Sequence, residues 1–492
     1  MLRYASIYQL ERCVVMTATK THPPSEQLND HAPPPSFSSL GLRDALLNNL
    51  SSLDYEGMTP IQEKGLPTLL AGHDVIAQAK TGSGKTAAFG LSVLHHLNVE
   101  IFAVQALVLC PTRELAEQVS QALRRLARLL PNVKILNLSG GMPMKPQLES
   151  LRHGAHIIVG TPGRVQKHLD GGALLLNKLQ TVVLDEADRM LDMGFVDAIK
   201  VILARCPKKR QTVLFSATYP PEIKELSSAF MHNPHRVVVD ETHTALDIEQ
   251  HFYEVRQPSD KFSLLKALLL HYQPISTLVF CNTKEQTKQV SDRLCKEGFS
   301  AIALHGDMEQ VERDVAMIRF ANQSCSILVA TDVAARGLDI KELPAVISYD
   351  LAFEHEAHVH RIGRTGRAGN KGLALSLTTP ADAERLCVIE RALAAPLIFG
   401  QSSRLNTTST NNALPTMVTL CLSAGRKDKI RPGDVLGALI KEAGLAYDMI
   451  GKIDIATLYS YVAIHHHHAD KAVRYFQGGK LKGRKVHVKR LR

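Results

Sequence analysis

One short stretch of the chain has the residue types and spacing of a phosphate-binding loop. It lies between a run that predicts a strand and one that predicts a helix, and it reads Ala79-Lys80-Thr81-Gly82-Ser83-Gly84-Lys85-Thr86. Glycines let backbone N–H groups close on phosphate oxygens, and the N-terminus of the next helix adds partial positive charge. Lys85 is placed to reach the β- and γ-phosphates of a nucleotide, and Thr86 to bind Mg²⁺. The strict pattern begins with Gly where this chain has Ala79. A glycine turn before a structural helix is the alternative, but strand, loop and helix in this order favour the phosphate site.

A cluster of acidic residues could supply the metal ligand and base that such a loop needs. Asp185-Glu186-Ala187-Asp188 follows directly on Thr181–Leu184, an apolar run that predicts a buried strand. Because strand ends in a parallel sheet face the ligand crevice, Asp185 is expected to hold Mg²⁺, directly or through water. Glu186 is expected to act as the base or to orient the attacking water. An acidic string alone is usually a solvated helix start, but the position after strand and loop favours the functional interpretation.

Further short strings of polar and basic residues follow one another along the chain. They are Tyr55–Gln62, Pro111–Leu115, Gly140-Gly141, Thr161–Arg164, Ser216–Thr218, Gln310–Arg313, Thr331–Asp339 and His360–Arg367. In this order, and with the loop and the acidic cluster, they resemble the motifs of the DEAD-box RNA helicases over about residues 37 to 395. The resemblance implies two RecA-like lobes that bind ATP and Mg²⁺ between them and clamp RNA.

The resemblance also assigns roles around the nucleotide. Gln62 and the upstream Phe37 are expected to read adenine, since a Gln amide can pair with both N6 and N7. The surrounding pattern departs from the common form at Asp54 and Met58, which replace Gly and Pro. The other implied roles are ribose contact by Asp339, arginine fingers at Arg364 and Arg367, and coupling of nucleotide state to unwinding by Asp188, Ser216, Thr218 and His360.

The same resemblance places RNA contacts on both lobes. The expected residues are Thr112, Arg113, Gly141, Thr161, Arg164, Arg313 and Thr331. With Lys85 and Mg²⁺ on one lobe and the arginine fingers on the other, hydrolysis requires a closed cleft. RNA bound across both lobes favours closure, so ATP and RNA are expected to assist each other's binding.

The elements that must position these residues are predicted from apolar runs. Short buried strands alternate with amphipathic helices, which is typical of a parallel α/β sheet. The first set of strands is Val75–Gln78, Ala106–Cys110, Ile157–Gly160, Thr181–Leu184 and Thr212–Ser216, and the second is Thr277–Phe280, Ile327–Ala330, Ala345–Tyr349 and Leu373–Leu377. We therefore expect a disordered arm over residues 1–36, lobe 1 over 37–242, lobe 2 over 243–398 and a linker over 399–415.

The last unit, residues 416–492, predicts an α+β fold of order βαββαβ that resembles an RNA recognition motif. Its strings Lys427–Leu439 and Gln477–Gly483 resemble the C-terminal domain of the bacterial DbpA-type helicases, which recognises a hairpin of large-subunit ribosomal RNA. The expected RNA contacts are Lys427, Lys429, Arg431, Tyr461, Lys480 and Lys482. Tyr459 and Tyr461 fit the aromatic positions of such a sheet, while Ile464 replaces the third, so recognition through loops is the alternative to base stacking.

The composition argues against several classes of protein. A net charge of +10 and a pI near 9.1 favour a polyanionic partner, and no apolar run approaches the ~18 residues of a membrane span. The eight cysteines form no C-x-x-C pair, which fits a reducing cytoplasm better than a disulfide scaffold or a zinc ribbon. Residues 1–15 lack the apolar core of a signal peptide, and Met16 is a plausible start. The run His465–His468 is either a metal site or a solvated strand end.

Three functions compete at this point. The first is an ATP-driven remodeller of 23S ribosomal RNA in assembly of the 50S subunit, acting as a monomer on hairpins and pre-50S particles. The second is a general RNA helicase whose basic tail binds any RNA. The third is an ATP-switched RNA clamp that unwinds little. The match of the tail favours the first, and DNA is not an expected substrate.

Overall fold

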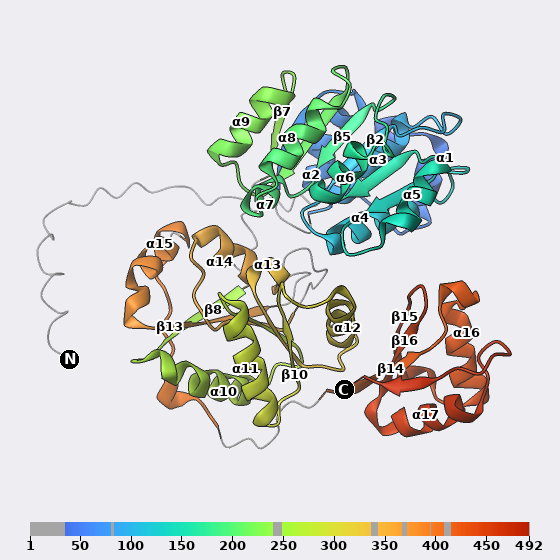
Figure 1. Ribbon diagram of the computed structural model, residues 1–492. Helices are drawn as coiled ribbons and strands as arrows, with labels where there is room; N and C mark the ends of the chain where they lie inside the picture. Colours follow the sequence, from blue (N-terminus) through green and yellow to red (C-terminus); the bar gives the residue numbers. More distant parts are fainter. Residues whose placement is uncertain are drawn as a thin grey trace, which may run out of the picture.

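The structure is a computed structural model that describes residues 35–79, 83–239, 248–335, 343–366, 371–393, 395–407 and 415–491. Three sheets organise these residues, with seven, six and four strands (Figure 1). The first two carry only parallel pairs and the third only antiparallel pairs. The expected fold class, two RecA-like lobes followed by an α+β unit, is confirmed. The predicted N-terminal arm lies almost wholly outside the described residues.

Lobe 1 is a doubly wound sheet of order β3-β4-β2-β5-β6-β1-β7. Its strands are β1 (Val75–Gln78), β2 (Ala106–Leu109), β3 (Ile135–Leu138), β4 (Ile157–Gly160), β5 (Thr181–Leu184), β6 (Gln211–Ser216) and β7 (His235–Val238). Successive residues of a strand point to opposite faces. Val75 and Ala77 therefore pack in one core while Ile76 packs in the other.

Nine α-helices cover the two faces of the lobe 1 sheet in the described ranges. They are α1 (Asp44–Ser51), α2 (Pro60–Leu70), α3 (Lys85–His96), α4 (Arg113–Leu126), α5 (Met144–Arg152), α6 (Pro162–Asp170), α7 (Ala187–Asp192), α8 (Val196–Ala204) and α9 (Pro221–Phe230). Burial on both faces is why the central strands are continuous apolar runs.

Lobe 2 repeats the plan with strand order β10-β11-β9-β12-β13-β8. The strands are β8 (Ile248–Glu254), β9 (Thr277–Phe280), β10 (Ala301–Leu304), β11 (Ile327–Ala330), β12 (Ala345–Ser348) and β13 (Gly372–Thr378). The helices are α10 (Lys261–Tyr272), α11 (Lys284–Lys296), α12 (Gln310–Ala321), α13 (Asp332–Ala335), α14 (His355–Ile362) and α15 (Ala383–Leu393). Figure 1 shows α13 and α14 on the side of lobe 2 that faces α7 of lobe 1.

The strands absent from the sequence prediction lie at the edges of the two large sheets. They are β3, β7, β8 and β10. Edge strands have one neighbour and more solvent contact, so their residues need not all be apolar. His235 and Arg236 of β7 are exposed, and Asn137 interrupts the apolar residues of β3. An apolar run is therefore a good signal only for central strands.

The tail forms the antiparallel sheet β15-β16-β14-β17 with helices on one face. Its elements are β14 (Met417–Leu422), α16 (Pro432–Gly437), β15 (Ile450–Ile455), β16 (Ser460–His465), α17 (Ala469–Gly478) and β17 (Val488–Arg490). The predicted βαββαβ order is confirmed. The first helix, α16, continues as a π-helical turn over Ala438–Glu442. Within the described ranges, no helix is long and apolar enough to cross a membrane.

Candidate nucleotide and RNA site between the lobes

The phosphate loop begins where β1 ends, and β1 lies between β6 and the edge strand β7 in the lobe 1 sheet. Ala79 donates its N–H to the Ser216 carbonyl oxygen at 3.1 Å, and α3 begins at Lys85. Gly84 has a φ of 93°, and a Cβ there would lie 2.5 Å from the Gln62 Nε2 and 2.8 Å from the Thr59 Oγ1. Only glycine fits this position. Lys80, Thr81 and Gly82 lie outside the described residues.

The expected adenine-reading segment packs directly on this loop. Gln62 is 2 % exposed, donates from Nε2 to the Gly84 carbonyl oxygen (3.1 Å) and accepts from the Thr59 N–H through Oε1 (2.9 Å). Thr59 in turn donates from Oγ1 to the Ser83 carbonyl oxygen (2.7 Å). Phe37 is buried in the lobe 1 core, with its ring edge-on to Tyr55 at a centroid distance of 6.1 Å. The amide of Gln62, which is expected to read adenine, is thus held against the phosphate loop.

Lys85 and Asp185 lie together below the loop. Lys85 Nζ donates to the Ala79 carbonyl oxygen at 3.1 Å, in a buried position. Asp185 is 3 % exposed at the end of β5, and its Oδ1 has no hydrogen-bond partner among the described residues. Burial raises the pKa of Asp185 to about 6, opposed by the charge of Lys85. A buried carboxylate oxygen without a partner is suited to a hard divalent cation, so the donor set fits Mg²⁺.

Glu186 occupies a special backbone position. Its φ of 53° is in the left-handed region, and it lies between β5 and α7, as the residue directly before the helix. Oε2 forms a buried ion pair with Arg189 Nη1 at 2.7 Å. Burial alone would raise the pKa of Glu186, but the charges of Arg189, Lys85 and Arg364 more than offset it, and the pKa lies below its ordinary value. Glu186 is therefore ionised at neutral pH.

Asp188 connects the acidic cluster to the end of β6. Its Oδ2 accepts from the backbone N–H groups of Ala217 and Thr218 (both 3.0 Å) and from the Thr218 hydroxyl (3.1 Å). Its own N–H donates to Ser216 Oγ at 3.3 Å. Of the four predicted coupling residues, three thus form one hydrogen-bonded unit within lobe 1.

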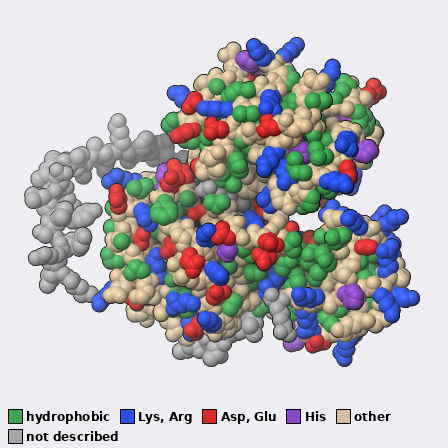
Figure 2. All heavy atoms as spheres, viewed as in Figure 1, with side chains coloured by type: hydrophobic (Ala, Val, Ile, Leu, Met, Phe, Trp, Pro, Cys, Tyr) green, Lys and Arg blue, Asp and Glu red, His purple; other side chains and the backbone are tan. Residues whose placement is uncertain are grey.

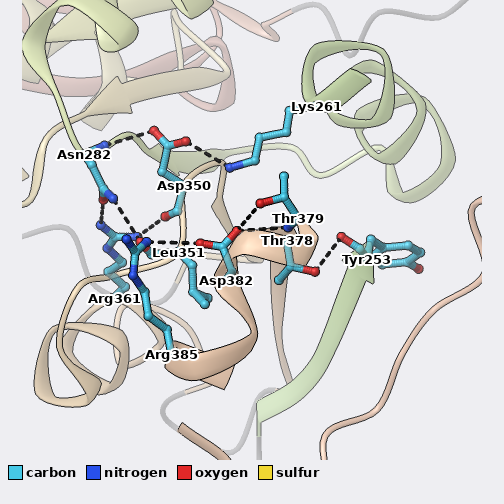
Figure 3. A network of polar contacts seen from close by, with 10 residues as sticks. All are labelled: Tyr253, Lys261, Asn282, Asp350, Leu351, Arg361, Thr378, Thr379, Asp382 and Arg385. Atoms are coloured by element: carbon cyan, nitrogen blue, oxygen red, sulfur yellow. Dashed lines mark hydrogen bonds and ion pairs between the residues drawn. The ribbon is translucent and has the colours of Figure 1, made fainter. Parts of the chain in front are cut away.

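Arg361 is a fully buried cation at the core of lobe 2. It is 1 % exposed and makes a bidentate pair with Asp332, with both N–H···O distances 2.7 Å. It also donates to Asn282 Oδ1 (2.8 Å) and to the Asp350 carbonyl oxygen (2.5 Å), and lies over the Phe280 ring. Figure 3 shows Asn282 and Asp350 converging on Arg361. This network fixes α14, which carries the residues that face lobe 1.

His360 and Arg364 bring lobe 2 to the acidic cluster of lobe 1. Arg364 is 7 % exposed, and its charge acts on Glu186. Burial, and then the charge of Arg189, lowers the pKa of His360 to about 4, opposed by Asp188 and Glu186, so His360 is neutral at physiological pH. A cavity of about 20 Å³ lies at this junction, lined by Arg189, Phe280, Asp332, Ala335, Ala357, His360, Arg361 and Arg364. Arg367 and Asp339 lie outside the described residues.

The expected RNA-contacting strings of the two lobes also meet. Arg113 Nη1 donates to Gln310 Oε1 at 2.8 Å, and Arg313 Nη2 pairs with Glu114 Oε1 at 3.0 Å. Each lobe thus supplies one arginine and one acceptor to a reciprocal contact between the starts of α4 and α12. Gly141 packs on the same arginine, since a Cβ there would lie 1.7 Å from Arg113 Nη1.

The other predicted RNA contacts of the lobes lie at strand ends and helix starts. Thr112 and Thr331 each accept, through Oγ1, a hydrogen bond from the backbone N–H three residues later (3.2 and 3.3 Å). Thr161 is buried directly before α6, and Arg164 within α6 donates to Gln147 Oε1 at 2.8 Å. These residues come from both lobes and share the side of the sheets that carries the nucleotide residues.

Basic side chains gather on the tail (Figure 2). Lys482 Nζ donates to the Lys429 carbonyl oxygen (2.8 Å) and pairs with Asp434 (3.3 Å), whose carboxylate also accepts the Arg431 N–H (2.8 Å). The structure therefore brings three predicted RNA contacts together, although they come from two separate strings. Lys427 and Lys480 are exposed as well.

Tyr461, a predicted RNA contact on the sheet of the tail, is largely covered. Tyr461 lies on the face of the tail sheet opposite its helices, but it is only 7 % exposed. That face packs on lobe 2: Thr419, 0 % exposed, bonds through Oγ1 to Ser324 Oγ (2.6 Å) and Asn322 Nδ2 (3.2 Å) at the end of α12. The covered ring is not available for base stacking, which favours loops as the recognition surface.

Some residues with evident roles were not singled out from the sequence. Arg189 could have been found, because it lies one helical turn after Glu186. Glu114 and Gln310 stand within strings that were recognised, but their contact is between lobes. Asn282, in the loop after β9, and Asp332, the first residue of α13, contact Arg361 from distant parts of the chain, and only the fold shows it.

Three family models match the chain. The DEAD/DEAH box helicase model matches residues 59–226, the helicase conserved C-terminal domain residues 260–369, and the DbpA RNA binding domain residues 419–490. The ATP-dependent RNA helicase DbpA of Escherichia coli is 51 % identical over 462 residues, which cover 93 % of this chain and all of the relative. The DEAD-box ATP-dependent RNA helicase CshA of Geobacillus kaustophilus is 43 % identical over 72 % of this chain and 76 % of its own length.

Solved structures show the same likeness in the two lobes. Dbp5 of S. cerevisiae bound to RNA and ADP BeF3 superimposes with a TM-score of 0.69 at 31 % identity, covering 75 % of this chain and 96 % of that one. The identity over nearly the whole chain and the matched tail decide the subfamily. The chain belongs to the DbpA-type DEAD-box proteins and is an ATP-dependent RNA helicase.

Proposed function

We propose that ATP hydrolysis takes place between Lys85, Asp185 and Glu186 of lobe 1 and Arg364 of lobe 2. The partnerless Asp185 Oδ1, together with the hydroxyl of Thr86, would hold Mg²⁺, which supplies charge neutralisation for the phosphates. Glu186 is ionised and oriented by Arg189, as a group that positions the attacking water must be. Arg364, and Arg367 beyond it, would stabilise charge on the transferring phosphoryl group.

We propose that the coupling to RNA runs through Asp188 and His360. Asp188 is tied to Thr218 on lobe 1, and the neutral His360 of lobe 2 lies within its electrostatic reach. The contacts of Arg113 and Arg313 across the lobes form at the expected RNA side of the same cleft. RNA that bridges the lobes would favour the closed state and with it hydrolysis.

We further propose that the substrate is 23S ribosomal RNA, remodelled by a cytoplasmic monomer during assembly of the 50S subunit. The observation that carries this is the tail: it matches the DbpA RNA binding domain, and hydrogen bonds bring Lys429, Arg431 and Lys482 together. The lobes contact RNA mainly through its backbone by the family pattern, so they cannot choose a sequence. We also propose the divisions 37–242, 243–398, 399–415 and 416–492 as the functional domains.

The experiment compares the ATPase of the full chain on a large-subunit rRNA hairpin and on a scrambled hairpin of equal length, at several salt concentrations. Wild type should prefer the rRNA hairpin at every salt concentration. The variant K427A/K429A/R431A should lose that preference, while Lys452→Ala, an exposed lysine elsewhere on the tail, should keep it. RNA binding that depends only on charge should fall for both hairpins alike as salt rises.

A general RNA helicase, or a clamp with a tail that binds any RNA, is the second candidate. The nine Lys and Arg residues without Asp or Glu over residues 471–492 favour it, since such a strip attracts any phosphate backbone. Equal stimulation by both hairpins across the salt series would replace the first proposal with this one.

A further inference from the structure

Three histidines converge where β16 of the tail ends. Adjacent residues of a strand point to opposite faces, so a histidine run within a strand cannot gather on one ion. Here the strand ends at His465, and the chain turns into a 3₁₀ helix over His466–His468. The ring centroids of His465 and His466 lie 4.7 Å apart, those of His466 and His467 3.9 Å, and those of His465 and His467 5.3 Å.

The nitrogen atoms of these rings are arranged as a ligand set. One ring nitrogen from each histidine lies within 4.8 Å of the others. His466 Nδ1 is hydrogen-bonded to the Thr416 carbonyl oxygen at 3.1 Å. A carbonyl on one ring nitrogen fixes the proton there and leaves the lone pair of Nε2 free, as in metal-bound histidines. His465 Nδ1 is buried and has no hydrogen-bond partner among the described residues.

A solvated strand end does not explain this arrangement. Rings that carried protons would repel one another, and a buried nitrogen without a partner costs free energy. Asp448, whose negative charge acts on His465, adds to the attraction for a cation.

We propose that His465, His466 and His467 form a binding site for a late first-row divalent cation, with Zn²⁺ as its physiological ion. Imidazole nitrogens prefer Zn²⁺, Ni²⁺ and Cu²⁺ over Mg²⁺ and Ca²⁺, which take oxygen ligands. The ion would join the end of β16 to Thr416, the residue directly before β14. It would therefore stabilise the start of the tail, independently of the nucleotide site.

The test is a Zn²⁺ titration of the full chain by calorimetry, with excess Mg²⁺ present to saturate the nucleotide site. Wild type should bind one Zn²⁺ per chain through these imidazoles. The variant H466Q/H467Q changes two exposed side chains and should weaken that binding at least tenfold. His153→Gln, an exposed histidine on lobe 1, should not, and neither should C295S/C387S, which removes two exposed thiols that could bind Zn²⁺ elsewhere.

Co²⁺ gives an independent readout of the ligands. It should bind wild type with the intense visible absorption of a low-coordinate nitrogen site, and H466Q/H467Q should abolish that band. RNA-stimulated ATPase of the variant reports that the fold is intact. Equal Zn²⁺ affinity in wild type and H466Q/H467Q, or a Co²⁺ spectrum unchanged by the substitutions, would overturn the proposal.

Discussion

The two lobes have the same parallel-sheet plan, yet they place opposite charges at the cleft. In lobe 1 the central strand β5 is followed by the carboxylates Asp185 and Glu186, and Asp185 Oδ1 has no hydrogen-bond partner in the part of the chain that the structure describes. Lobe 2 presents cations, of which Arg361 is enclosed by acceptors while Arg364 acts on Glu186 across the cleft. In the proposed site neither lobe contains all the reacting groups, so the distance between the lobes would control the reaction.

Within lobe 2, some residues act at the cleft and others hold the lobe together. Arg361 and Arg364 lie three residues apart in the same motif, the first in α14 and the second just after it. All the contacts described for Arg361 are within lobe 2, whereas Arg364 faces lobe 1. Substitutions should therefore affect stability at one position and turnover at the other.

The largest effect on ATP turnover is expected from a substitution in the phosphate loop of lobe 1. Lys85→Ala removes the cation that lies beside Asp185 and, by the loop pattern, reaches the phosphates. ATP turnover should fall to background, measured by phosphate release at saturating RNA. Lys64→Ala, an exposed lysine of α2, is the matched control and should keep turnover. Substantial turnover in Lys85→Ala would show that the loop does not bind the reacting phosphates.

Breaking the lobe 2 network should cost stability. Arg361→Met leaves the partly buried Asp332 and Asn282 without their cation, which should destabilise lobe 2 by about 3 kcal/mol. Denaturant unfolding followed by circular dichroism measures this. Arg391→Met, an exposed arginine of α15, should change the free energy of unfolding little. If both variants are equally stable, the network is not what holds α14.

His358 should make lobe 2 sensitive to acid. Burial, and then the charge of Arg361, lowers its pKa from an ordinary 6.5 to about 4. As pH falls below 6.5 the unfolded chain takes up the proton first, so stability is lost between pH 6.5 and 4 and is fully present above it. This difference corresponds to about 3 kcal/mol at most.

Unfolding of wild type, His358→Gln and His355→Gln across pH 4 to 7 isolates this contribution. His358→Gln should flatten the pH dependence, whereas His355→Gln, an accessible position on the same helix, should leave it unchanged. Parallel curves for wild type and His358→Gln would contradict the assignment.

A smaller effect is expected where lobe 1 couples the acidic cluster to β6. Thr218→Val removes the hydroxyl that donates to Asp188 Oδ2, at a cost of about 1–2 kcal/mol. Duplex unwinding should fall more than RNA-stimulated ATPase, with both rates measured on the same preparation. Thr218→Ser keeps the hydroxyl and should restore unwinding. A parallel loss of both activities in Thr218→Val would mean that the contact is only structural.

The parts of the fold and site that depend on nearby residues could be predicted from the sequence. Some patterns are local because each spans only a few consecutive residues: the central strands, the loop before α3 and the acidic cluster after β5. Edge strands such as β7 could not be predicted in this way, because their partly exposed residues do not form an apolar run. The enclosure of Arg361 and the pairing of Arg313 with Glu114 depend on residues far apart in the chain.

Tyr461 shows the same limit in the tail. Its sequence position is that of a base-stacking residue, and only packing of the sheet on Ser324 and Asn322 of lobe 2 explains its burial. A domain's own pattern does not tell which of its faces a neighbouring domain covers.

The central claim is that lobe 2 completes the active site of lobe 1, and Arg364→Ala tests it most directly. ATP affinity and ATP turnover should be measured on the same preparation at saturating RNA. The account predicts nearly unchanged affinity and a loss of turnover of about 10³ or more, the range of other arginine fingers. Full RNA-stimulated turnover in Arg364→Ala would contradict a site shared between the lobes.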